Sequence, residues 1–137
     1  MGDWGPGVFD NDTAADWVLG IENSTDMSLI ESTVEKVLKV GDQFLMASIA
    51  KEALAAIEVV SRLKGKGGDE NASSEPVDKW VEANKFDISS SLLDSCEIAI
   101  DKIVGNNSGL NNLWRGNVEY YGQWKQGVID LKKRISS

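Results

Sequence analysis

The sequence contains no histidine, one cysteine and two prolines. Without histidine, the commonest general base and the commonest metal ligand are missing, which argues against catalytic triads and most zinc sites. A single cysteine excludes an internal disulfide and a cysteine zinc cluster. No apolar run approaches the roughly 18 residues of a membrane span, and residues 1–6 lack the basic and apolar stretches of a signal peptide. We therefore expect a cytoplasmic protein that does not insert into membranes.

Basic residues are missing from the start of the chain. The 137 residues include 22 acids and 14 bases, which gives a formal charge of −8. Residues 1–35 hold eight acids and no Lys or Arg, and residues 1–58 carry the whole excess, with eleven acids against three bases. This charge argues against nucleic-acid binding, because phosphate backbones repel it. The acidic segment is either a solvated face or a docking surface for a basic partner.

Apolar residues recur at helical spacing along the chain, and no alternating β-branched run predicts a strand. Longer helices are predicted over about 13–21, 28–40, 44–64, 87–104 and 117–135, and shorter ones near 76–84 and 108–114. The 44–64 segment is apolar over most of its circumference, which is typical of a central helix. We predict one all-α domain over residues 1–137, a bundle of five longer helices plus one or two short ones with an extended N-terminal arm. The polar stretch 64–75 is predicted to be a mobile loop.

No segment fits a known catalytic or metal-binding pattern. The stretch 10–21 begins like a calcium loop, but its fifth, sixth and twelfth positions are apolar, and the stretch 69–80 fails at its sixth and twelfth positions. The glycine-rich stretch 65–68 lacks the Gly-Lys-Ser/Thr triplet of a phosphate-binding loop. Cys96 lies on an apolar stripe with no histidine to activate it, so we expect an inert core thiol. We predict no catalytic residue, no metal site and no cofactor.

Several polar and aromatic residues have expected structural roles. Asn11 and Asp12 are placed to cap the first helix, and Ser28 with Glu31 has the spacing of a capping box at the second. Glu58 lies on an otherwise apolar helix, so it needs a partner if it is buried. The Trp4 indole, or backbone donors of the N-terminal arm, are the partners we expect if it is buried, and its i,i+4 spacing to Arg62 predicts a helix ion pair. Trp4 is also expected to pin the glycine-rich arm to the body.

The opening Trp4-Gly5-x-Gly7-x-Phe9-x-Asn11-Asp12, followed by Ala-Ala-Asp-Trp at 14–17, resembles the start of a bacterial family catalogued as a domain of unknown function, number 4259. Stretches at 53–60 and 108–114, and Trp124 with Leu131, fit the same family in order. The polar 64–75 loop departs from it by its length. The resemblance implies a single helical domain and brings no reaction, cofactor or catalytic residue. The shared polar residues Asn11, Asp12 and Glu58 are structural or functional.

Two classes of function fit these observations. The first is a non-enzymatic acidic binding protein, most concretely an immunity protein or antitoxin that neutralises a basic toxin such as a nuclease by covering its substrate-binding surface. Its expected partner-binding residues are acids from the basic-free segment: Asp10, Asp16, Glu22, Asp26, Glu31 and Glu35. The second is a carboxylate-based enzyme or small-molecule binder, which needs a pocket with two acids of shifted pKa. A housekeeping scaffold subunit is a third possibility that the sequence does not separate from the first.

Overall fold

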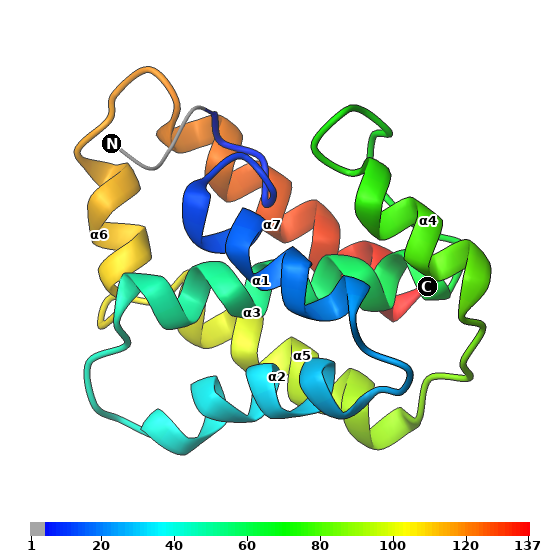
Figure 1. The fold of residues 1–137 in the computed structure, drawn as a ribbon. Helices are drawn as coiled ribbons and strands as arrows, with labels where there is room; N and C mark the ends of the chain where they lie inside the picture. Colours follow the sequence, from blue (N-terminus) through cyan, green and yellow to red (C-terminus); the bar gives the residue numbers. More distant parts are fainter. Residues whose placement is uncertain (1–4) are drawn as a thin grey trace.

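The computed structural model describes residues 5–137, and seven helices account for most of this part of the chain (Figure 1). They are α1 (Asp12–Glu22), α2 (Ser28–Val40), α3 (Ala47–Leu63), α4 (Glu75–Ala83), α5 (Ser90–Ile103), α6 (Gly109–Arg115) and α7 (Tyr121–Ser136). The described residues contain no strand, and an isolated bridge joins Leu45 to Ser108. The predicted all-α bundle is confirmed, with α4 and α6 as its two short helices.

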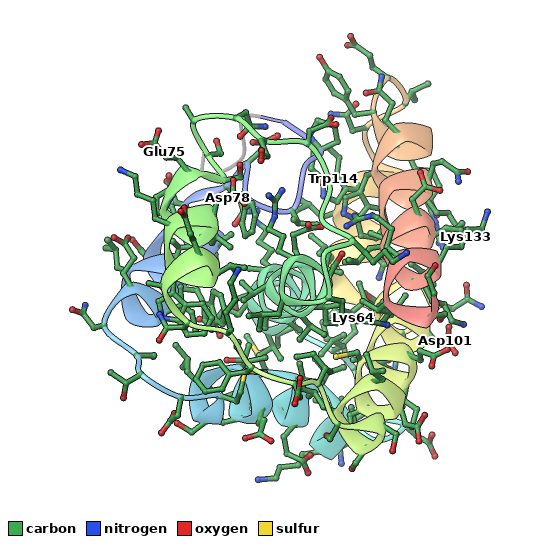
Figure 2. The ribbon with its side chains drawn as sticks, turned by 90° about the vertical axis from the view of Figure 1, so that its right-hand side faces the viewer. Lys64, Glu75, Asp78, Asp101, Trp114 and Lys133 are labelled. Atoms are coloured by element: carbon green, nitrogen blue, oxygen red, sulfur yellow. The ribbon has the colours of Figure 1, made fainter. Side chains whose placement is uncertain are left out.

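Helix α3 is the centre of the bundle, as its composition predicted. Figure 2 looks along this helix and shows it end-on, surrounded by the others. Each of the other six helices packs against α3. Every residue of α3 from 53 to 61 is consequently buried. The alanines in this stretch are small and let the neighbouring helices approach α3 closely. Any polar side chain in this stretch must find its partners inside the protein.

The surrounding helices bury one face each. In α7 the buried residues Trp124, Val128, Leu131 and Ile135 keep the spacing expected from the sequence. Burying an aliphatic side chain of this size stabilises the fold by about 1.5–3 kcal/mol. Among residues 5–137, no helix is both long and apolar enough to span a membrane.

Tryptophan indoles add specific ties between elements. The Trp17 indole N–H donates to the Thr33 hydroxyl at 2.9 Å, which joins α1 to α2. The Trp80 indole N–H donates to the carbonyl of Ser24 at 2.9 Å, which joins α4 to the α1–α2 connection. Buried indoles need such acceptors because an unpaired N–H in the core is costly.

The first helix begins as predicted, and the second does not. The Asn11 side chain accepts from the Ala14 N–H at 2.7 Å and caps α1. The capping box expected at Ser28 is wrong, because Ser28 is already the first residue of α2. The Asp26 carboxylate instead accepts from the Ser28 N–H at 3.0 Å and from its hydroxyl at 2.7 Å. An acidic cap of this kind also suits the positive end of the helix dipole.

Candidate functional site

The most unusual local arrangement surrounds Glu58, whose side chain on α3 is only 3% exposed. Its two oxygens receive both terminal nitrogens of Arg134 on α7: Nη2 lies 2.9 Å from Oε1, and Nη1 lies 3.2 Å from Oε2. The Gly68 N–H donates to Oε2 at 3.0 Å, and Arg62 Nε lies 3.1 Å from the same oxygen. Glu58 is therefore buried with partners, but they come from α3, α7 and the 64–75 loop. The expectation of a backbone donor from the arm is wrong for its described residues 5–10, and Trp4 lies outside the described residues.

Arg62 extends this cluster from α3 toward α4 and the arm. Its Nη1 donates to the Asp78 carboxylate on α4, and its Nη2 donates to the carbonyl of Asp69 at 2.7 Å. Its Nε contact with Glu58 is an ion pair that is not aligned as a hydrogen bond. The guanidinium lies 5.8 Å from the centre of the Phe9 ring, a cation–π distance. The arm is thus tied to Glu58 indirectly, through Arg62.

The same cluster holds the 64–75 loop against the bundle. Arg134 Nη1 donates to the carbonyl of Lys66 at 3.1 Å and to the Ser61 hydroxyl at 2.8 Å. The Ser61 hydroxyl in turn donates to the carbonyl of Lys66 at 2.5 Å. These bonds fix one end of the loop through the buried Ser61 of α3 and the partly buried Arg134 of α7, while the mobility of the loop stays a prediction.

A cavity of about 360 Å³ lies above this cluster. The arm, α3, the 64–75 loop and α7 all contribute to its walls, and the buried rings of Phe9 and Trp124 form apolar parts of them. Arg62, Glu58 and Arg134 line it as well. The volume lies at the lower end of the roughly 300–1,000 Å³ typical of ligand pockets.

Three further acidic residues line the cavity: Asp10 from the arm, Asp69 from the loop and Asp130 from α7. Glu58 and Asp78 neutralise Arg62 and Arg134 through the ion pairs described above. No lysine is among the lining residues. The lining therefore keeps the negative charge of the three carboxylates.

The arm's glycines are explained by Asp10. The Gly7 N–H donates to the Asp10 carboxylate at 3.2 Å, so the carboxylate curls back over the arm. A methyl group on Gly5 or Gly7 would lie 2.8 or 2.6 Å from that oxygen. Only glycine fits at these positions without moving Asp10. The shared opening motif therefore has a structural basis at Gly5, Gly7, Phe9 and Asn11.

The six acids predicted to bind a partner do not form one compact site. Asp10 is partly buried and lines the cavity, at the end of α1 opposite Glu22. Helix α1 alone is about 16 Å long by its helical rise. The other five are exposed on the first two helices and their connection: Asp16, Glu22, Asp26, Glu31 and Glu35. Asp12, predicted to be structural, is the exposed first residue of α1.

Among these acids, Asp26 has a shifted pKa. The hydrogen bonds from the Ser28 hydroxyl and N–H favour its charged form and lower its pKa below the usual value. Elsewhere, burial and the nearby charge of Glu97 raise the pKa of Cys96 to about 12, so this thiol is a poor nucleophile. In the part of the chain that the structure describes, no three acidic or cysteine side chains are grouped as a metal site.

The sequence identified Glu58 and its pair with Arg62 but missed Arg134 and Gly68 as its partners. The i,i+4 spacing of Glu58 and Arg62 places both on one face of a helix, and the structure confirms the ion pair that this spacing predicts. Arg134 lies in the last turn of α7, where a cation is expected for the helix dipole alone. Nothing in its spacing identifies a partner 76 residues away.

A comparison with family models matches residues 2–127 to the family described as Domain of unknown function (DUF4259). This confirms the resemblance expected from the opening motif. No curated protein and no solved structure matches the chain. The family description names no reaction, ligand or partner, so function must be argued from the residues themselves.

Proposed function

The chain belongs to the DUF4259 family, and we propose that it is a non-enzymatic protein that binds a basic protein partner. In its most concrete form it is a bacterial, cytoplasmic immunity protein or antitoxin that covers the substrate-binding surface of a basic toxin such as a nuclease. The observation that carries this proposal is the exposure of five acids on α1, α2 and their connection, in a segment with no basic residue before Lys36. None of the five has an ion-pair partner among residues 5–137.

The outward face of α1 adds an apolar contact point. Leu19 is 60% exposed and lies three residues from both Asp16 and Glu22, so the three share one face of the helix. An apolar residue among charged neighbours matches the usual plan of an interface, with an apolar centre and a polar rim. This arrangement supports a protein partner over a purely solvated acidic face.

The mechanism follows from the charges. Lysine and arginine side chains that a nuclease uses to hold phosphates are attracted by the acids of α1 and α2. Electrostatic steering raises the association rate, and the bound protein then blocks the substrate by occupying the same surface. The arrangement of Glu58 supports this reading over catalysis by that carboxylate, because Arg62, Arg134 and Gly68 already occupy its oxygens.

The test is a comparison of three immobilised proteins with a lysate of the native cell. One is wild type, and the second reverses four acids: Asp16→Lys, Glu22→Lys, Glu31→Lys and Glu35→Lys. The third is a control of equal charge change at exposed acids elsewhere: Glu82→Lys, Asp87→Lys, Asp94→Lys and Glu119→Lys. We expect wild type and control to retain the same basic protein at low salt and to release it at high salt, while the first reversal variant retains none.

The retained protein must then behave as a toxin. Co-expression with wild type is expected to suppress its toxicity, and co-expression with the α1–α2 reversal variant is not. The proposal is contradicted if the reversal variant and wild type retain the same basic proteins, or if the four control reversals abolish retention equally.

A further inference from the structure

We infer that the cavity between the arm, α3, the 64–75 loop and α7 is a binding site for an organic cation, a guanidinium or alkylammonium group. The inference goes beyond the proposed function and does not rest on it, since none of residues 16–35 lines the cavity. It rests on the cavity's volume of about 360 Å³, its aromatic walls and the sign of its unneutralised charge.

The charge of the cavity excludes an anion despite its two arginines. Arg134 gives its terminal nitrogens to Glu58, Ser61 and the Lys66 carbonyl. Arg62 gives its own to Asp78 and the Asp69 carbonyl, with its Nε against Glu58. The charges of both arginines are neutralised by these carboxylates, and the charge that remains on the lining would repel a phosphate or carboxylate.

Three acidic residues of the lining have no cationic partner among the residues that the structure describes. Asp69 and Asp130 are exposed at the surface, and Asp10 on the arm is partly buried. The Asp10 carboxylate accepts from the Gly7 N–H and the Asp130 carboxylate from the Gln126 amide, and both of these donors are neutral. The three acids come from different segments, and the fold brings them to the lining of one cavity. Oxygen acceptors on several sides suit a guanidinium or ammonium group, which carries three or more donors.

The walls suit the apolar stem of such a ligand. The lining includes the aromatic residues Phe9 and Trp124, and Val128 from the same helix as Trp124. Alkyl stems of cations pack against apolar surface while their heads stay near carboxylates and water. The combination selects a cation with a short alkyl chain over a bare metal ion.

The cluster below the cavity holds these walls in place. Glu58 binds α7 through Arg134 and the loop through Gly68, while Arg62 binds the arm through Phe9. A site whose walls are held by buried charge pairs loses less freedom when a ligand binds. The cluster of Glu58, Arg62 and Arg134 therefore holds the segments that line the cavity in position. Both oxygens of Glu58 are already bound, so we do not expect Glu58 to contact the ligand.

The probe for this inference is butylguanidinium chloride, titrated into the ¹⁵N-labelled protein. The signals to follow are the Trp124 indole N–H and the Gly68 amide, because both residues line the cavity. Butylurea serves as the neutral isostere and butyrate as the anion. We expect saturable shifts with butylguanidinium, and none with butylurea or butyrate over the same concentration range.

The double variant Asp69→Asn/Asp130→Asn removes two exposed lining charges without touching the core. It is expected to weaken butylguanidinium binding by about tenfold or more. The matched control Glu70→Gln/Glu119→Gln removes two exposed charges that do not line the cavity and is expected to bind as wild type does. The inference is overturned if butylurea binds as tightly as butylguanidinium, if the double variant binds like wild type, or if no saturable shift occurs.

A second arm separates the sources of the cation. If the cation is a basic side chain of a protein partner, butylguanidinium displaces the protein retained by the immobilised chain. If it is a free small molecule, the shifts saturate and the retained protein stays bound. Failure of the shifts would leave the α1–α2 reversal experiment unaffected, so the two proposals fail separately.

Discussion

Glu58 and Arg134 lie 76 residues apart and meet through two hydrogen bonds, Nη2 to Oε1 at 2.9 Å and Nη1 to Oε2 at 3.2 Å. The pair joins the central helix α3 to the last helix α7. Because the Lys66 carbonyl and the Gly68 N–H bind the same two side chains, the pair also closes the 64–75 loop onto the bundle. A charged group in the core thus sets the position of three segments at once.

Replacement of Glu58 by glutamine is expected to lower the free energy of unfolding by about 3 kcal/mol. It removes the carboxylate charge that pairs with both Arg62 and Arg134, and the side chain of Arg62 is only 7% exposed. Breaking a buried pair from one side costs about 3–5 kcal/mol, and the partial exposure of Arg134 places the expected value at the lower end. Urea unfolding of wild type and Glu58→Gln measures the difference.

The matched control for this change is Glu82→Gln, an exposed residue of α4. Its unfolding free energy is expected to stay within about 0.5 kcal/mol of wild type. Equal stability of Glu58→Gln and wild type would show that the cluster does not hold the fold together. Hydrogen exchange at the Gly68 amide gives a local readout, which is expected to speed up in Glu58→Gln alone.

How much of this region was predictable depends on sequence distance. The sequence indicated that Glu58 needs a partner if it is buried, and the i,i+4 spacing indicated Arg62. Arg134 did not follow from the sequence, because its position depends on how α7 crosses α3. The apolar stripe of α7 determines which face is buried but not where along α3 that face packs. The cavity was not predictable for the same reason, because its shape depends on how α7 crosses α3. It also depends on the 64–75 loop, whose sequence has no hydrophobic periodicity that would predict its conformation.

The helix boundaries show a second, local limit. Asn11 was identified because an N-cap is a one-residue signal next to an apolar stripe. Ser28 was predicted to cap the second helix, but the Asp26 carboxylate accepts from the Ser28 N–H instead. Both side chains can accept from an N–H of the first turn, so the residue types allow either. Competition between neighbouring caps is decided by the conformation of the preceding turn, which the residue types leave open.

Gly67→Ala is expected to destabilise the protein by about 1–3 kcal/mol, since a new methyl group would lie 2.5 Å from Arg62 Cγ. Arg62 cannot move aside easily because both ends of its guanidinium are bound. Gly127→Ala is the matched comparison, because this glycine lies inside α7 with nothing within 4 Å of the added methyl. It is expected to stabilise by about 0.5–1 kcal/mol. Thermal unfolding that shifts both variants in one direction would contradict the packing described for the loop.

The contribution of Asp26 to stability is expected to depend on pH. Hydrogen bonds from Ser28 lower the pKa of this carboxyl in the folded protein below its unfolded value of about 3.9. Its charged form therefore stabilises the fold fully above about pH 4, and the stabilisation is lost as the pH falls through the folded pKa. Urea unfolding of Asp26→Ala and wild type between neutral pH and about pH 2 should show a difference that disappears in acid. A difference that stays constant over that range would contradict the cap.

Cys96 is expected to resist alkylation in the folded protein. Burial raises the pKa of its thiol to about 12, whereas an unfolded thiol titrates near about 8.5. Iodoacetamide at about pH 8 should therefore react at least about a hundredfold more slowly with the native protein than with the protein in urea. The same shift predicts that stability falls as the pH rises between those two values, because the unfolded chain releases the proton first. Equal rates in the two states would show that the thiol is accessible.

The central claim is that Glu58 holds α3, α7 and the 64–75 loop together through its pair with Arg134. A double-mutant cycle tests the coupling of these two residues most directly. Urea unfolding of wild type, Glu58→Gln, Arg134→Met and the double variant gives the coupling energy, the departure of the double variant from the sum of the single changes. We predict a coupling of about 1–3 kcal/mol, with the double variant more stable than that sum implies, because removal of both partners leaves fewer unpaired buried charges. If the effects of the two single changes add to within about 0.3–0.5 kcal/mol of the double variant, the coupling of Glu58 to Arg134 is contradicted.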